Sequence, residues 1–255
     1  MRLRRANDHL RLHAICRDGG RPSRGLLRRG GVTVTDSSSL DEEAVAVLHD
    51  APAAVISDAL DRLGRRDQVL DLAIRPLWPE ARLAGVAVPV VIVADTSEPE
   101  LPYDGELTTL DGLRPGDVPL LTVERGVRCA SWGELFSCAA IGRGAAGAVV
   151  DGFVRDGAQI RVLGFPTFAR GLSPLDTFAR AVVTGIDVEA RVGGVEVRPG
   201  DLVIGDVDGI VVVPQEMVAD VAEAVVTKHR LEGNAREDLL AGMSIREVWV
   251  KYGVL

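Results

Sequence analysis

The chain has 255 residues, of which 47% are hydrophobic and 26% charged, and its formal net charge is −8. These values are typical of a soluble globular protein with one large domain or two small ones. The negative charge argues against a nucleic-acid-binding groove on the folded part. Aromatic residues make up only 4%, so the core must consist of branched aliphatic residues and Ala, which favours a β-rich or α/β fold.

The first thirty residues differ in charge from the rest of the chain. They carry nine Arg against Asp8 and Asp18, and they contain several glycines and no periodic apolar face. This composition predicts a disordered basic arm over residues 1–38. A nucleic-acid-binding tail and a translation start assigned too early are the alternatives.

The sequence also predicts where the protein resides. No uninterrupted apolar run reaches the roughly 18 residues that a membrane helix needs, so we expect no membrane span. The three cysteines form no Cys-x-x-Cys pair. An odd number without such a pair indicates reduced thiols, so we expect a cytoplasmic protein.

The first half of the domain is predicted to begin with two helices. A capping box at Ser39-Leu-Asp-Glu42 predicts a helix to about residue 49, and a second helix follows over 53–63. The apolar run over 83–94 predicts a buried strand, although Pro89 favours an edge strand, a bulge or two short strands. We expect a polar loop over 95–110 and a strand over 118–123.

The centre of the chain predicts a strand–helix–strand unit. After a bend at Trp132-Gly133 we expect a short helix over 134–141 with Leu135, Cys138 and Ala139 facing inward. A strand over 146–151 then leads into a loop. Ligands of such units bind at the carboxyl ends of strands, near helix N-termini. We therefore expect Arg155 and Asp156 to lie close to Gly133.

The last hundred residues predict mixed strands and helices. The pattern indicates a helix over 158–163, strands over 165–170, 187–197 and 202–213, a long helix over 214–241, and a final helix capped by Ser244. Together the elements predict a single layered α/β domain over residues 39–255, with a mixed central sheet and C-terminal helices.

The residues around the central bend suit a small keto acid. Arg155 offers a planar cation that matches a carboxylate, and Asp156 is a hard oxygen ligand for Mg²⁺ or Mn²⁺. Glu134 is the second carboxylate, expected to reach a metal-bound water. The free amides of residues 133–136 can bind an anion. The alternative is that Arg155 and Asp156 are loop charges in a surface ion pair.

Six motifs point to a known family. They are Ser57-Asp-Ala-Leu60 with Gly64, Trp132-Gly-Glu-Leu-Phe136, Asp151-Gly-x-x-Arg-Asp156, Gly200-Asp-Leu-Val203, Asp206-x-Asp-Gly-x-Val-Val-Val-Pro214 and Tyr252-Gly-Val-Leu255. With these motifs, residues from about 40 to 255 resemble the 4-hydroxy-4-methyl-2-oxoglutarate aldolases, a family that includes the regulator of ribonuclease activity A (RraA). The basic arm is not covered by the resemblance.

The resemblance implies an αββα-type fold and a homotrimer or hexamer with sites near subunit interfaces. It implies Mg²⁺ or Mn²⁺ held directly by Asp156 and through water by Glu134. It places pyruvate on Arg155 and on the amides of Gly133, Glu134, Leu135 and Phe136. The implied reactions are cleavage of 4-hydroxy-2-oxo acids to pyruvate and decarboxylation of oxaloacetate, both through a pyruvate enolate. A non-catalytic regulator of a ribonuclease is the alternative.

Two departures from the family pattern concern carboxylates. Glu134 stands where well-studied members have Asp. A neighbouring subunit is also expected to supply a carboxylate, for which Glu232 and Glu237 are both candidates. A lysine imine mechanism is not expected, because the only lysines, Lys228 and Lys251, lie in the C-terminal helices.

Overall fold

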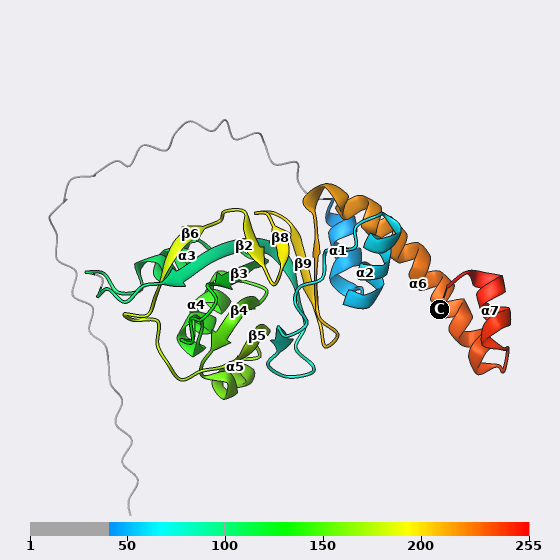
Figure 1. Cartoon of the computed structure of the whole chain (residues 1–255). Helices are drawn as coiled ribbons and strands as arrows, with labels where there is room; N and C mark the ends of the chain where they lie inside the picture. The colour runs from blue at the N-terminus through cyan, green and yellow to red at the C-terminus, as the bar shows by residue number, and fades with distance from the viewer. Residues whose placement is uncertain (1–40, 99, 255) are drawn as a thin grey trace, which may run out of the picture. The chain divides into compact units, whose positions relative to one another are not determined.

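A mixed eight-stranded sheet forms the centre of the fold (Figure 1). The structure is a computed structural model that describes residues 41–98 and 100–254. The strand order is β1-β5-β4-β3-β2-β9-β10, and β6 pairs with β2 beside this path. The predicted arm over residues 1–38, with its boundary, lies outside the described residues.

The secondary structure has the α/β character predicted from the sequence. The strands are β1 (Arg75–Pro76), β2 (Leu83–Ala94), β3 (Asp117–Val123), β4 (Ala148–Val154), β5 (Thr167–Leu172), β6 (Ala181–Ile186), β7 (Ala190–Val192), β8 (Val195–Val197), β9 (Leu202–Gly205) and β10 (Ile210–Val213). The helices are α1 (Glu42–Asp50), α2 (Ala53–Arg62), α3 (Asp104–Gly112), α4 (Glu134–Arg143), α5 (Gly157–Leu163), α6 (Val218–Leu240), which a 3₁₀ turn (Gln215–Met217) precedes, and α7 (Ile245–Tyr252).

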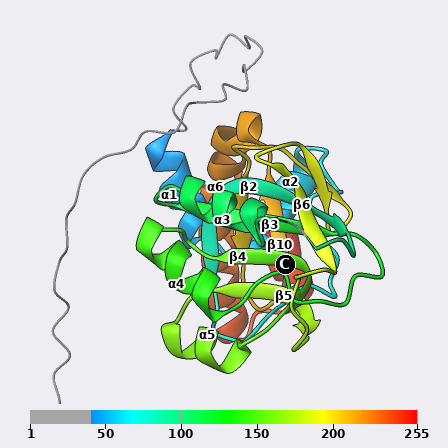
Figure 2. The ribbon, with the colours of Figure 1, turned by 90° about the vertical axis from the view of Figure 1, so that its left-hand side faces the viewer.

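The sheet is covered on both faces. Helices α3, α4 and α5 lie along one side of the strands in Figure 2, and their buried residues Leu110, Ala140 and Ile160 share a core cluster with Val150 of β4. The hairpin formed by β7 and β8 contributes to a second cluster with the other face. Helices α1, α2 and α6 pack with β9 and β10. The predicted mixed sheet and C-terminal helices are confirmed.

The parallel part of the sheet sets the position of the candidate site. β2, β3, β4 and β5 pair in parallel, so their carboxyl ends meet at one edge. β4 runs to Val154 and does not end at residue 151 as expected, so Gly152 is a strand residue. Arg155 and Asp156 therefore follow directly on the end of β4.

Pro89 does not make β2 an edge strand. β2 pairs with β3 along one side, whereas its other side pairs with β9 at residues 83–86 and with β6 at residues 90–94. Pro89 lies between these two partners, where its missing N–H breaks no ladder bond on that side, and its carbonyl accepts the N–H of Asp187 at 2.9 Å. A change of partner thus accommodates the proline within one long strand.

Three local predictions were wrong. Helix α3 lies in the predicted loop over 95–110. Its sequence is poor in helix formers, and it packs against β6 at Gly105, where an added Cβ would come within 2.4 Å of Val183. β6 was not predicted, because it is a half-exposed strand that contains Gly185. The N-cap of α1 is Asp41, whose carboxylate accepts the N–H of Glu43; Ser39 lies outside the described residues.

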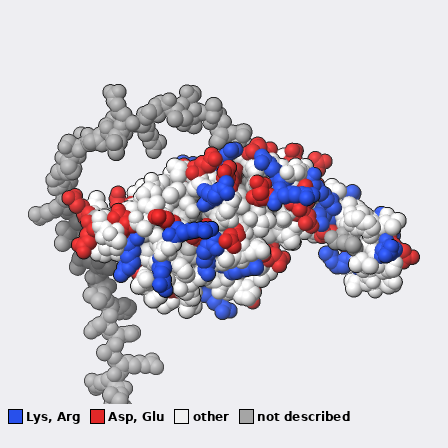
Figure 3. Space-filling model, viewed as in Figure 1, with Lys and Arg blue, Asp and Glu red and all other residues white. Residues whose placement is uncertain are grey.

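The described surface carries charges of both signs, and the helices are short or polar. On the face shown in Figure 3, acidic and basic side chains are interspersed, without a continuous basic stripe across the described residues. Within residues 41–98 and 100–254, every helix is too short or too polar to cross a bilayer. The final helix α7 begins with the expected capping box between Ser244 and Glu247.

Candidate active site

The chain before α4 runs alongside the end of β4. The N–H of Ser131 donates to the carbonyl of Phe153 at 2.9 Å, and the N–H of Arg155 donates to the carbonyl of Trp132 at 2.9 Å. These bonds extend the strand pairing beyond the sheet and bring Gly133 beside Arg155. A Cβ added to Gly133 would be 3.1 Å from Cγ of Arg155 and 3.0 Å from Oδ2 of Asp156. The expected proximity of these residues is observed.

Asp156 supplies the cap that Gly133 cannot give to α4. Its backbone has a left-handed φ of 58°, a conformation that Asp tolerates better than most residues. Its Oδ2 accepts the N–H of Glu134 at 3.3 Å. The positive end of the α4 dipole favours a negative charge there. The carboxylate is still 41% exposed, so it remains accessible to a ligand.

Arg155 is held between two carboxylates. Its Nη1 is 2.8 Å from Oδ2 of Asp176, and its Nε is 3.7 Å from Oδ2 of Asp156. The ion pair with Asp156, which the sequence offered as the alternative to a ligand site, is therefore present but long. The stronger partner is Asp176. The side chain of Arg155 is 40% exposed, which leaves part of the guanidinium available.

Asp176 was not predicted from the sequence. It follows β5 and lies 21 residues after Arg155, and no motif connects the two. Partial burial raises the pKa of the Asp176 carboxyl. The N–H of Phe178 and the guanidinium of Arg155 outweigh that effect, so the pKa lies below its ordinary value. Burial and the Asp176 carboxylate together raise the pKa of the Tyr103 hydroxyl. Asp176 is therefore ionised at neutral pH, and Tyr103 is neutral.

Arg155 and Asp156, but not Asp176 or Tyr103, border an open cavity of about 510 Å³ at the carboxyl ends of β4 and β5. Its lining residues are Arg155, Asp156, Gly157, Leu172, Ser173 and Pro174. Leu172 at the end of β5 and the two residues after it were also missed, because the predicted strand ended at residue 170, two residues early. The cavity combines one cation, one carboxylate and an apolar wall.

Helix α4 presents different residues to the core from those expected. Leu135 is 75% exposed, and Cys138 and Ala139 are also exposed, so the prediction that they face inward is wrong. The buried positions are Ser137 and Ala140. Ser137 can be buried because its hydroxyl accepts from Nε1 of Trp132 at 2.9 Å and donates to the carbonyl of Gly133 at 3.0 Å. Phe136 packs edge-on against Trp132, with ring centroids 5.8 Å apart.

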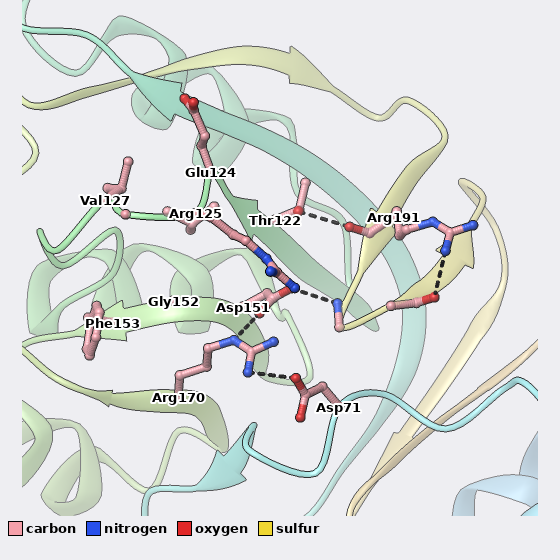
Figure 4. A pocket seen from close by; sticks show the side chains of 14 residues that line it. Asp71, Thr122, Glu124, Arg125, Val127, Asp151, Gly152, Phe153, Arg170 and Arg191 are labelled. Carbon is pink, nitrogen blue, oxygen red and sulfur yellow. Dashed lines mark hydrogen bonds and ion pairs between the residues drawn. The ribbon is translucent and has the colours of Figure 1, made fainter.

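A larger cavity of about 610 Å³ contains the first residue of the Asp-Gly-x-x-Arg-Asp motif (Figure 4). Asp151 accepts from Nε of Arg170 and, at 2.7 Å, from the N–H of Gly193. Nη1 of Arg170 is in turn 2.9 Å from Asp71. These bonds tie β4, β5 and the β7–β8 hairpin together. Asp151 therefore serves the framework, and Arg155 and Asp156 belong to the other cavity.

The carboxylates near α4 could supply only some of the ligands of a divalent ion. Among residues 41–98 and 100–254, no group of three or more His, Cys, Asp or Glu side chains gathers closely enough to hold a metal. Asp156 would be one ligand, and water and substrate would fill most other positions. Mg²⁺ and Mn²⁺ tolerate a coordination sphere made mostly of water and substrate, because Mg²⁺ commonly keeps several waters and uses one or two carboxylates. The donor set fits these hard ions.

The lysines and the two candidate glutamates occupy distinct positions in the C-terminal helices. Nζ of Lys228 is 2.8 Å from Asp58 and 2.7 Å from Glu232. Burial lowers the pKa of Lys228, but these two carboxylates more than reverse the effect and raise it. A hydrogen bond to Asp238 raises the pKa of Lys251. Both lysines are thus protonated. Glu232 is engaged within its own chain, whereas Glu237 is exposed.

Comparisons with known proteins show the family of the chain. The family described as RraA-like, Aldolase/RraA, matches residues 53–212. A protein of Halalkalibacterium halodurans, provisionally named 4-hydroxy-4-methyl-2-oxoglutarate aldolase, is 32% identical over 214 residues, which cover 82% of this chain and 95% of that protein.

Two solved structures have the same fold. An uncharacterised protein from Pseudomonas syringae has a TM-score of 0.70 at 26% identity, covering 82% of this chain and 98% of its own. RraAS2 of Streptomyces coelicolor, described as an unusual member of the RNase ES inhibitor RraA protein family, has a TM-score of 0.69 at 27% identity, covering 77% of this chain and 96% of its own. The chain therefore belongs to the RraA-like family of aldolases and RraA proteins.

Proposed function

We propose that the protein is a divalent-metal-dependent aldolase that cleaves 4-hydroxy-2-oxo acids, such as 4-hydroxy-4-methyl-2-oxoglutarate, and releases pyruvate. Decarboxylation of oxaloacetate through the same pyruvate enolate is the accompanying activity. One observation carries the proposal: Arg155 and Asp156 lie against Gly133 at the N-terminus of α4, beside an open cavity. The aldolase name of the relative from H. halodurans supports the same reaction class.

The residues of the site have separate roles in this proposal. Mg²⁺ or Mn²⁺, held by Asp156 directly and by Glu134 through water, would polarise the keto oxygen of the substrate. The substrate carboxylate binds to amides in the first turn of α4. The N–H of Glu134 already donates to Asp156, so the amides of Leu135 and Phe136 are the better donors. Arg155 stabilises the negative charge that develops on the enolate.

The bond changes are those of a retro-aldol reaction. The C3–C4 bond of the substrate breaks and its electron pair passes into the pyruvate enolate. The 4-hydroxyl loses its proton and becomes a carbonyl group, and the enolate takes up a proton to give pyruvate. In oxaloacetate, the bond between C3 and the departing CO₂ breaks instead, and its electron pair forms the same pyruvate enolate. No lysine takes part, because Lys228 and Lys251 are engaged by carboxylates.

We also propose that the protein is a homotrimer or hexamer that works in the cytoplasm. Exposed apolar side chains on α4 and α5, among them Leu135 and Val162, and on α6 and α7, among them Leu240 and Val250, support self-association. Light scattering should give three or six times the mass of 27.1 kDa. A monomer at micromolar concentration would contradict this assembly.

The test of the activity is pyruvate release from oxaloacetate and from 4-hydroxy-4-methyl-2-oxoglutarate, with Mg²⁺ or with EDTA. Asp156→Ala is expected to abolish the metal-dependent rate. Arg155→Ala is expected to lower it by about 10²-fold or more, as for other donors that stabilise developing charge. If the wild-type protein releases no pyruvate from either substrate, the alternative of a non-catalytic RraA-like regulator of a ribonuclease gains the support that the enzyme loses.

A further inference from the structure

Hydrogen bonds within the turn over residues 176–180 fix the position of Asp176, which also binds Arg155. Its Oδ1 accepts the N–H of Phe178 at 3.1 Å, and its backbone carbonyl accepts from Nη1 of Arg180 at 3.1 Å. Its Oδ2 is then free to take the guanidinium of Arg155 at 2.8 Å. Asp176 is therefore a rigid anchor for a long side chain.

The other carboxylate within reach of Arg155 is that of Asp156, whose Oδ2 lies 3.7 Å from Nε. If Asp176 were absent, the guanidinium would have Asp156 as its remaining partner within 4.0 Å among the described residues. A close Arg155–Asp156 pair would occupy oxygen lone pairs that a divalent ion requires, and the guanidinium would repel the ion. The separation of these two side chains thus matters to metal binding.

We propose that Asp176 is a positioning residue that draws the guanidinium of Arg155 away from Asp156 and so keeps the Asp156 carboxylate available to the divalent ion. This inference rests on the proposed metal-dependent function and adds to it a residue that no motif contains. Because Arg155 lines the cavity, the same bond also sets the direction in which its remaining N–H groups can meet a keto acid.

The environment of Asp176 keeps it charged for this task. Its pKa is lowered overall, because the Phe178 amide and the Arg155 guanidinium outweigh the effect of burial. Tyr103 adjoins it and packs near Phe178, with ring centroids 6.5 Å apart. Tyr103 also has a left-handed φ of 65°, an uncommon conformation for a bulky residue. The N-terminus of α3 is thus held close to Asp176.

A double-mutant cycle on the full chain tests the role of Asp176. Mn²⁺ affinity is measured by titration calorimetry without substrate in the wild type, Asp176→Ala, Arg155→Met and the double variant. We expect Asp176→Ala to weaken Mn²⁺ binding about tenfold when Arg155 is present, a coupling within the range for contacting residues. In the Arg155→Met background we expect less than about a twofold change, because no guanidinium remains to pair with Asp156.

The matched control is Asp111→Ala, which removes an ion pair of the same 2.8 Å length with Arg143, at the other end of α4. It should leave Mn²⁺ affinity unchanged. Asp176→Asn keeps an acceptor oxygen and replaces Asp176→Ala in the cycle if the alanine variant melts early. For Asp176→Asn we expect a smaller loss of affinity than for alanine.

The outcomes separate this inference from the proposed function. If Asp176→Ala weakens Mn²⁺ binding equally in both backgrounds, Asp176 acts through its charge alone and the positioning role is overturned. Unchanged affinity in both backgrounds overturns it as well. A wild-type protein that binds no Mn²⁺ overturns the metal-dependent function, and the role of Asp176 falls with it.

Discussion

Two cavities at the carboxyl ends of the parallel strands use the same residue types in different ways. In the larger one, Asp151 is engaged through both oxygens, by Arg170 and by the N–H of Gly193. In the smaller one, Asp156 accepts one long bond of 3.3 Å from the N–H of Glu134. The first carboxylate is 14% exposed and the second 41%. One motif therefore supplies a framework residue at its first position and accessible residues at its last two.

This difference shows that residue type and spacing do not by themselves identify a reactive group. Arg170 has two carboxylate partners in a network that joins three elements. Arg155 has one close partner, and its second lies at 3.7 Å. Unfilled bonding capacity beside a helix N-terminus is what a ligand can use. The two cavities thus differ in how many donors and acceptors of their charged side chains are already paired within the protein.

The largest expected contrast comes from the same substitution at the two ends of the motif. Asp156→Asn should remove the metal-dependent release of pyruvate and change the free energy of unfolding by less than about 0.5 kcal/mol. Asp151→Asn should lower that free energy by about 2 kcal/mol, because it removes the charge through which Arg170 and the N–H of Gly193 are joined and leaves Arg170 with Asp71 alone. Activity assays and urea unfolding of both variants measure the two effects. Full activity in Asp156→Asn would show that the more exposed carboxylate is not the reactive one.

The second prediction concerns the space beside the smaller cavity. In Gly133→Ala, the new Cβ would meet Asp156 and Arg155 at 3.0 and 3.1 Å, which is tighter than an ordinary contact. Displacement of the two side chains should lower kcat/KM by about 10- to 100-fold. Steady-state kinetics measure this change.

A matched glycine serves as the control for that substitution. Gly142 lies in the same helix, and an added Cβ there meets no atom within 4 Å. Gly142→Ala should keep full activity and raise stability by about 0.5–1 kcal/mol through helix propensity. Equal losses of activity in both variants would point to a general effect on α4.

The smallest expected effect is on the acid dependence of stability. Because the pKa of Asp176 is lowered in the folded protein, its ion pair with Arg155 stabilises the fold above the ordinary Asp pKa of about 4. That stabilisation is lost as the pH falls through the lowered value. Asp176→Asn should therefore lose less stability than the wild type between about pH 5 and pH 2. Urea midpoints at several pH values provide the measurement, and parallel curves would exclude a contribution from Asp176.

The sequence predicted the parts of the fold that depend on local patterns. The apolar run of β2 and the Ser244 capping box both have short-range causes. The predicted strand–helix–strand unit correctly placed Arg155 and Asp156 beside Gly133. Helix α3 and strand β6 were missed, because both depend on tertiary contacts: α3 packs on β6 at Gly105 and Val183, and β6 pairs with β2. The spacing of apolar residues in either segment does not indicate these contacts.

The missed residues of the site share another cause. Asp176 meets Arg155 across 21 positions of sequence, and its local bonds with Phe178 and Arg180 belong to a turn that no motif marks. Leu135 illustrates the converse, since an apolar residue at a helical position was expected inside but is exposed. Such placements depend on tertiary contacts and on surfaces that one chain leaves uncovered.

The attachment of β6 has a consequence for motion near the site. Within residues 41–98 and 100–254, β6 joins the sheet only through β2, whereas the path from β1 to β10 is continuous without it. β6 can therefore detach as a local unit while the remaining ladder stays closed. Helix α3 packs on Val183 of β6 and begins beside Tyr103. Detachment of β6 would therefore first loosen Tyr103, which adjoins Asp176. Amide hydrogens of β6 should then exchange with solvent well before those of β4, and guanidinium orientation at residue 155 would fluctuate on the same timescale.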